Sequence, residues 1–137
     1  MKKQLFALLG LGLLLLGISA YAQTVNLKAD VPFNFIVSGA TLPAGEYTIQ
    51  GLGDGNAMSI RSSDNKEKRL AMSHRCESLK TAERTKLVFH RYGDRYFLAQ
   101  IWVAGNNSGS ELPKSPREVE VAQDYPVQQV VLFAALR

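Results

Sequence analysis

The chain has few residues that could cross-link it or bind soft metals. Cys76 is its only cysteine, so no intrachain disulfide can form, and His74 and His90 are its only histidines. After Ile18 it has no apolar run near the roughly 20 residues that a membrane-spanning helix needs. These absences exclude a disulfide-rich scaffold, so burial of apolar side chains must hold the fold together.

The sequence also lacks the spacing of known catalytic motifs. It has no glycine-flanked serine nucleophile with ordered His and Asp, no metal-protease histidine pair and no phosphate-cradling glycine loop. Its 12 Asp and Glu residues are scattered, whereas a glycosidase needs two carboxylates facing each other across a cleft. We therefore expect a protein that is not an enzyme and uses no cofactor. A small hydrolase is the least favoured alternative.

Residues 1–22 have the pattern of an export signal. Two lysines precede an apolar run from Leu5 to Ile18, and the small-x-small sequence Ala20-Tyr21-Ala22 follows it. Cleavage before Gln23 predicts a mature domain over residues 23–137, with 14 basic and 12 acidic side chains and a formal charge of +2. We expect it in the periplasm or outside the cell, without a stable membrane span after cleavage. Nucleic acid is not an expected partner there.

Alternation of apolar and polar residues predicts strands for most of residues 23–137. Apolar residues fall two apart along four runs: Leu27, Ala29 and Val31; Phe33, Phe35 and Val37; Tyr47 and Ile49; Met58 and Ile60. Turn formers such as Gly, Pro, Asn and Ser separate the runs about every ten residues. This spacing predicts an all-β fold, a single antiparallel β-sandwich of seven to eight strands.

The stretch over residues 84–103 predicts a hairpin that turns at Gly93-Asp94. A two-residue loop would pair Phe89 with Leu98 and mix the apolar rows. An odd loop or a bulge gathers one apolar face, and we expect that arrangement because a slip of one residue turns a whole row over. The expected inner face is Leu87, Phe89, Phe97, Ala99, Ile101 and Val103, and the expected outer face is Val88, His90, Tyr96, Leu98 and Trp102.

The C-terminal part predicts one short helical element and a final strand. Ser115-Pro116-Arg117-Glu118 has the form of a helix capping box with proline at the first helical position. Val119 and Val121 favour a strand, so we expect at most a short helical turn near residues 116–121. The β-branched and apolar run from Val127 to Leu136 predicts the last strand.

The segment "LPAGEYTI", Leu42 to Ile49, has the composition of a tight turn. Pro43 presets the backbone of the first corner, and Gly45 can adopt a positive φ. We expect Leu42 and Tyr47 to pack inward and Glu46 to face solvent. The segment therefore predicts a structural turn and no chemistry.

This segment also carries a resemblance to known proteins. Phe33-x-Phe35-x-Val37 followed by "LPAGEYTI", with "YFLAQIW" and "ELPKSPRE" downstream, resembles a group of short exported Gram-negative bacterial proteins of uncharacterised function. The Leu-Pro-x-Gly-x-Tyr piece alone resembles an edge of prealbumin-like sandwiches, found in bacterial surface proteins and carboxypeptidase regulatory domains. Both resemblances imply a β-sandwich, and neither implies an activity.

His74 and Cys76 lie two residues apart, a spacing that zinc or copper could use on one strand face. Their row continues through Leu70 and Met72, which predicts a buried thiol and a core histidine. His90 falls on the opposite face of its own strand. We therefore expect no metal site.

The segment over residues 61–95 is basic, with ten Lys and Arg residues against five Asp and Glu residues. Its expected outer face joins cations to aromatic rings, a combination that suits anionic or neutral sugars. The candidate ligand-binding residues are Arg69, Arg75, Lys86, Tyr96 and Trp102. The leading hypothesis is a binding or structural module that recognises envelope polysaccharide. Two alternatives stay open: a protein-interaction module of an envelope assembly, and a solvated face that only keeps the sheet soluble.

Overall fold

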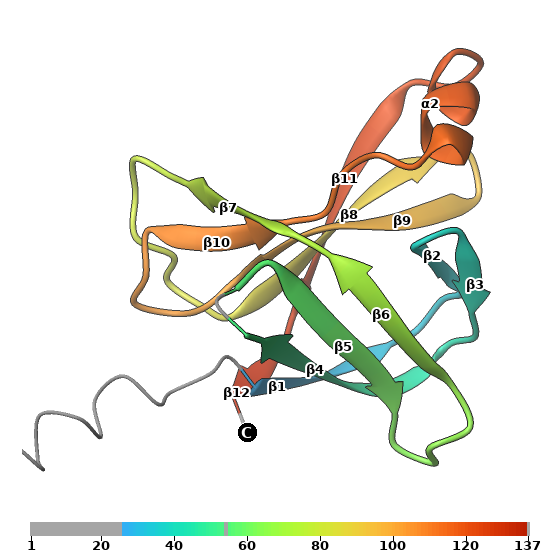
Figure 1. Ribbon diagram of the computed structural model, residues 1–137. Coiled ribbons are helices and arrows are strands. Elements are labelled where there is room, and N and C mark those ends of the chain that lie inside the picture. The colour runs from blue at the N-terminus through green and yellow to red at the C-terminus, as the bar shows by residue number, and fades with distance from the viewer. Residues whose placement is uncertain (1–25, 54, 137) are drawn as a thin grey trace, which may run out of the picture.

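A computed structural model describes residues 26–53 and 55–136. The expected export signal, residues 1–22, lies outside the described residues. Within them the chain forms strands β1 to β12 and one short helix, α2. The strands build two sheets, which confirms the predicted all-β, sandwich-like fold (Figure 1). No helix among these residues is long and apolar enough to cross a membrane.

The first sheet has the strand order β12-β1-β4-β5-β6, and each neighbouring pair is antiparallel. Its strands are β1 (Asn26–Val31), β4 (Gly45–Leu52), β5 (Ala57–Ser62), β6 (Lys68–Met72) and β12 (Ala135–Leu136). Leu27, Ala29 and Val31 are buried along β1, as their alternation predicts. One row of side chains from this sheet therefore faces the second sheet.

The second sheet has the order β11-β8-β9-β10-β7, and the β2–β3 hairpin joins it at β9. Its strands are β2 (Phe35–Val37), β3 (Ala40–Leu42), β7 (His74–Glu77), β8 (Lys86–Tyr92), β9 (Arg95–Trp102), β10 (Ser108–Glu111) and β11 (Val127–Phe133). The pairing of β2 with β9, at Ile36 and Phe97, is parallel, a departure from the purely antiparallel sheet that we expected.

Two segments of chain pass from one sheet to the other. Strand β6 at the edge of the first sheet continues through Ser73 into β7 at the edge of the second (Figure 1). Likewise, β11 continues through Ala134 into β12. Such corners subdivide strands that read as single runs in the sequence. Together with the short β2 and β3, they give twelve strands in the described residues instead of the predicted seven to eight.

The predicted facing of β6 is wrong. Leu70 and Met72 are 59% and 68% exposed, whereas Ala71 between them is buried. The cause is the register with β5, which places Ala71 opposite the buried Met58 and so on the inner face. Arg69 shares that inner row at the sheet edge, where its Nη2 donates a 2.8 Å hydrogen bond to the Ser38 carbonyl.

The β8–β9 hairpin has both a two-residue loop and a bulge, which the sequence analysis treated as alternatives. Gly93 has a φ of +62°, and the two-residue loop pairs Tyr92 with Arg95 and Phe89 with Leu98. A bulge then follows, because Val88 pairs with Gln100 and leaves Ala99 as the extra residue. Leu87, Phe89, Leu98 and Ile101 consequently share the main core. The expected inward positions of Phe97 and Ala99 are wrong. The bulge lies beyond Phe97 and not at the turn, so the residues between the turn and the bulge keep the register of the two-residue loop.

The main core lies between the sheets and is rich in aromatic contacts. Phe35 meets both Tyr47 and Phe89 edge to face, with ring centroids 5.1 and 5.7 Å apart. Leu42 and Tyr47 are buried and Glu46 is exposed, which confirms the predicted inward and outward residues of the "LPAGEYTI" segment. This segment links β3 of the second sheet to β4 of the first and does not close a hairpin.

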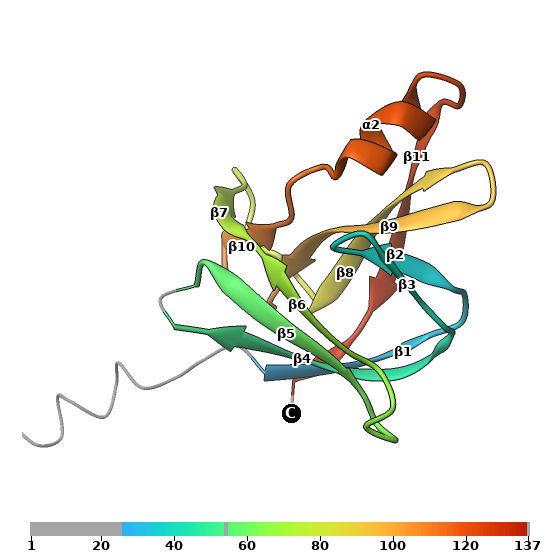
Figure 2. The same cartoon turned by 45° about the vertical axis from the view of Figure 1, so that its right-hand side comes forward.

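A smaller core lies on the other face of the second sheet, under helix α2 (Pro116–Ala122). Figure 2 shows α2 beside the end of the sheet where β11 begins. The cluster comprises Ile36, Tyr92, Phe97 and Val121. Ser115 caps the helix, since its Oγ accepts a 3.2 Å hydrogen bond from the Glu118 amide. The predicted short helix is confirmed, and Val121 lies in it because burial on Phe97 and Tyr92 outweighs its strand preference.

Candidate functional site

The outer face of the second sheet has a groove at the end that α2 does not cover. Strand pairing places Phe133, Lys86 and Trp102 in one row across β11, β8 and β9. The next row is Val131, Val88 and Gln100. Side chains of directly paired residues stand on the same face of a sheet, so these rows form the floor of the groove.

The segment over residues 78–84 forms the wall of this groove. Backbone hydrogen bonds from Ser78 to Asn107, 2.8 Å, and from Ala82 to Asn106, 2.9 Å, fix it to the β9–β10 connection. The hollow has a volume of about 550 Å³, within the range of ligand-binding clefts. Its lining residues are Ser78, Lys80, Thr81, Ala82, Glu83, Arg84, Lys86, Val88, Gln100, Trp102, Gln129, Val131 and Phe133.

Trp102 is buried in the sheet and only 8% exposed. Its Nε1–H donates a 3.0 Å hydrogen bond to Gln100 Oε1. Its ring lies against Gly109 of β10, where a Cβ would come within 2.7 Å of the indole. Trp102 therefore exposes little of its ring to the groove, unlike the open ring face that we expected.

The charge of the groove is positive. Lys80, Arg84 and Lys86 line it, and Glu83 is the one carboxylate among its described lining residues. The Arg84 guanidinium lies over the Phe133 ring, with Cζ 3.8 Å from the centroid, a cation–π contact that orients the arginine. Hydroxyl and amide groups from Ser78, Thr81, Gln100 and Gln129 complete the lining. The groove thus offers hydrogen bonds and positive charge beside apolar patches.

The five predicted binding residues do not form one face. Lys86 and Trp102 lie opposite each other in the groove. Arg75 pairs with Ser110, which in turn pairs with the buried Ile101, so Arg75 is on the inner face of the same sheet. Arg69 belongs to the first sheet. Two features of the fold separate these residues: the corner at Ser73 and the bulge in β9.

Tyr96 also departs from the expected outer face. Its ring stacks on Phe33 with centroids 3.8 Å apart and packs against the main core. The bulge at Ala99 places Tyr96 and Trp102 on opposite faces of β9, although they are an even number of residues apart. A strictly alternating strand would have kept them together.

Sequence reasoning missed three contributors to the groove: Lys80, Arg84 and Phe133. Lys80 and Arg84 belong to the basic segment over residues 61–95. Alternation of apolar and polar residues predicts which face a strand residue lies on, but it does not predict where a loop residue lies relative to a sheet. Phe133 lies in the odd-numbered row of the final strand, and only the pairing of β11 with β8 brings that row beside Lys86. The strand order, which has no local signal, was the missing information.

The candidate metal ligands come from two strands, with His74 and Cys76 on β7 and His90 on β8. The His74 side chain is 59% exposed, with Nε2 3.4 Å from Glu111 Oε2, and His90 Nδ1 lies 3.4 Å from Glu118 Oε2. Cys76 is free and half-buried, and burial, with Glu111 nearby, raises the pKa of its thiol. The expected core positions of His74 and Cys76 are therefore wrong. In the part of the chain that the structure describes, no three His, Cys, Asp or Glu side chains gather as a metal site.

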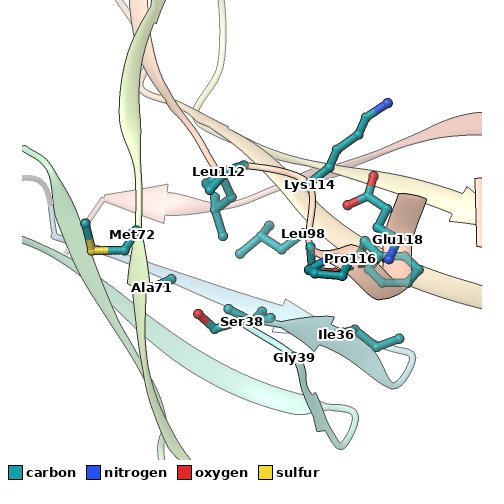
Figure 3. Close-up of a pocket in the computed structure, with 14 residues that line it drawn as sticks. Ile36, Ser38, Gly39, Ala71, Met72, Leu98, Leu112, Lys114, Pro116 and Glu118 are labelled. Atoms are coloured by element: carbon teal, nitrogen blue, oxygen red, sulfur yellow. Dashed lines mark hydrogen bonds between the residues drawn. The ribbon is translucent and has the colours of Figure 1, made fainter. Parts of the chain in front are cut away.

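A second hollow, of about 380 Å³, opens between the two sheets where β6 and the linker after β10 diverge (Figure 3). Its walls are mainly apolar, from Ala71, Leu98 and Leu112, while Lys114 extends away from it. The Ser38 carbonyl accepts from Arg69, and Glu118 accepts a 2.9 Å hydrogen bond from the Tyr92 hydroxyl. This crevice thus offers mainly apolar contact.

The charged and polar groove therefore offers more specific recognition chemistry than the apolar crevice. Comparisons with protein-family models, curated proteins and solved structures found no match to this chain, so the choice of site depends on its own geometry.

Proposed function

We propose that this protein is an exported, non-enzymatic binding module of the cell envelope, and that its outer-face groove binds an anionic polysaccharide. The observation that carries the proposal is the direct pairing of Lys86 with Trp102 in a groove that also holds Lys80 and Arg84. Export is inferred from the sequence pattern of residues 1–22.

The lining chemistry supports a sugar polymer with negative charge. Three cations against one carboxylate attract an anion. Ser78, Thr81, Gln100 and Gln129 can exchange hydrogen bonds with sugar hydroxyls. The apolar surfaces of Val131 and Phe133, 45% and 50% exposed, can contact the carbon faces of the rings.

The same lining favours binding over hydrolysis. Glycoside hydrolysis uses two carboxyl groups on either side of the scissile bond. Among the described residues that line the groove, Glu83 alone carries a carboxylate. A small hydrolase therefore stays the least favoured alternative.

The test compares two double variants that remove the same charge from opposite faces. Arg84→Ala with Lys86→Ala removes two groove cations, and Arg69→Ala with Arg75→Ala is the matched control outside the groove. Binding to alginate, a uronic-acid polymer, is measured by titration calorimetry, with neutral dextran as comparator. We expect the groove variant to weaken alginate binding about tenfold, since each exposed charge contact contributes up to about 1 kcal/mol. We also expect weaker binding at higher salt.

Two results would count against the proposal. The control pair could weaken binding as much as the groove pair, which would mean that only net charge matters. Alternatively, neither alginate nor a panel of other acidic glycans would bind at low salt. Circular dichroism of both double variants distinguishes these results from unfolding.

A protein-interaction module is the second candidate, and a specific observation favours it. The free edge of β11 is exposed, largely apolar and uncharged. This candidate predicts that a pull-down from envelope extract retains a defined protein partner, and that acidic glycans neither bind the groove nor displace that partner.

A further inference from the structure

Strand β11 is an unusually regular edge. It pairs with β8 over seven consecutive residues without a register shift, and its other side has no neighbour in the described sheet. From Pro126 to Leu136 the sequence contains no charged residue. On its outer row, Val127, Val131 and Phe133 are 54%, 45% and 50% exposed.

Natural edge strands are normally protected against pairing by lysines, bulges or an internal proline. The other long edges of this fold have charged residues: β6 carries Lys68 and Arg69, and β7 carries Arg75 and Glu77. Within β11 none of these devices is present. Its backbone donors and acceptors are therefore available to another strand.

We propose that β11 pairs antiparallel with β11 of a second copy of this chain, so that the second sheet continues through a two-fold axis. With the axis at Val130, all seven residues pair, and Val127 of one copy lies opposite Phe133 of the other. Directly opposite residues share a face, so Val127 of each copy packs beside Phe133 of the other on the outer row, and Val131 lies beside Gln129. The inner row pairs in the same way, and Val130 meets its own counterpart.

The charges around β11 favour a second copy as the occupant. Exposed Asp124 lies just before the Val127 end, and exposed Arg84 lies on Phe133 at the other end. Antiparallel pairing brings Asp124 of each copy toward Arg84 of the other. The axis itself passes through uncharged residues, so no like charges meet there.

The pairing does not depend on the proposed function, although it would affect it. Gln129, Val131 and Phe133 form the β11 side of the groove. A two-fold axis perpendicular to the sheet therefore places both grooves on one face of a continuous sheet. Such a pair of grooves could hold one polymer at two points, which increases the overall affinity.

The first experiment measures mass by analytical ultracentrifugation of the purified protein over about 1 to 100 μM, a range in which edge pairing of this size should be detectable. We expect a monomer–dimer equilibrium. Val127→Lys should weaken the dimer at least about tenfold, because a lysine from each copy then enters the dimer interface near Arg84 of the other copy. Val127→Asp should weaken it less, and Leu70→Lys, at an equally exposed site on the β6 edge, should leave it unchanged. A monomer at every concentration, or equal effects of Val127→Lys and Leu70→Lys, would overturn the proposal.

A cross-link tests the register of the pairing directly. In a Cys76→Ser background, Val130→Cys places two thiols opposite each other, within the Cα separation that a disulfide spans. Mild oxidation should give a covalent dimer from Val130→Cys and none from a Leu70→Cys control. Failure of Val130→Cys to cross-link while the protein sediments as a dimer would show that another surface pairs. Alginate binding by a monomeric protein would support the groove while overturning the edge pairing.

Discussion

The Tyr92 hydroxyl donates a 2.9 Å hydrogen bond to Glu118 Oε2, and this contact joins the second sheet to helix α2. Both side chains are buried, with 1% and 4% exposure. Glu118 is also the residue whose amide is capped by Ser115, so one residue fixes the start of the helix and its attachment to β8. Burial of a carboxylate requires such partners, since an unpaired charge away from water is costly.

Replacement of Tyr92 by Phe should lower the free energy of unfolding by about 1.5 to 3 kcal/mol, because the substitution leaves a buried carboxylate with one hydrogen-bond donor fewer. Urea titration followed by circular dichroism measures the change. Tyr125→Phe is the matched control, since Tyr125 is 52% exposed, and it should change stability by less than about 0.5 kcal/mol. Equal effects of the two substitutions would contradict the assigned role of Tyr92.

Stability should fall at alkaline pH through the same residue. Burial, the hydrogen bond to Glu118 and the charge of that carboxylate raise the pKa of Tyr92 to about 12, from 10.0 in the unfolded chain. The Tyr92 hydroxyl therefore stays protonated to a higher pH in the folded state than in the unfolded state. The resulting stabilisation is fully present below pH 10 and is lost as pH rises from 10 through about 12.

Urea midpoints measured between pH 9 and 12 test this window, with Tyr92→Phe as the comparison. The variant should lose less stability than the wild type as pH rises. It should keep some dependence, because burial also raises the pKa of Tyr47. Parallel curves for the two proteins would show that Tyr92 does not control the alkaline limit.

Gly109→Ala should displace Trp102. A methyl group at position 109 would lie 2.7 Å from the indole and 2.6 Å from the Ile101 carbonyl oxygen, so either the ring or the backbone must move. We expect a loss of about 1 to 3 kcal/mol in unfolding free energy. Trp102 is the only tryptophan, so its fluorescence reports the displacement directly as a red shift. Ser110→Ala, one residue along the same strand, should leave the emission maximum unchanged.

Two leucines test the corrected facing of β6. Leu98 is 4% exposed in the main core, whereas Leu70 is 59% exposed. Leu98→Ala should destabilise the protein by about 2 to 5 kcal/mol, and Leu70→Ala by less than about 0.5 kcal/mol. Thermal and urea unfolding of the two variants compare the same substitution at a buried and at an exposed site. A large loss of stability from Leu70→Ala would support the inward facing of Leu70 that alternation alone predicted.

Local pattern was sufficient where a strand stays in one sheet and pairs without interruption. The rows of β1 and β5 follow their alternation, and the Ser115 cap begins α2 as its sequence indicates. These features depend on neighbours within a few residues, so the sequence carries their full signal. The all-β fold could be predicted for the same reason.

The facing of β6, β7 and β9 depends on distant parts of the chain. Ala71 faces inward because of Met58, and the corner at Ser73 is held by Asn56, whose carbonyl accepts a 3.0 Å hydrogen bond from the Ser73 amide. The bulge at Ala99 shifts the second half of β9 by one residue. Only two of the five residues of the expected aromatic and cationic face stay together after these shifts, the pair Lys86 and Trp102.

The pairing of β1 with β12 has a consequence for biosynthesis. Leu27 pairs with Leu136 and Lys28 with Ala135, so β1 pairs with residues far later in the sequence. During translation β1 therefore lacks one of its two neighbours until residues 135 and 136 have been synthesised. Contacts of such long sequence separation slow folding.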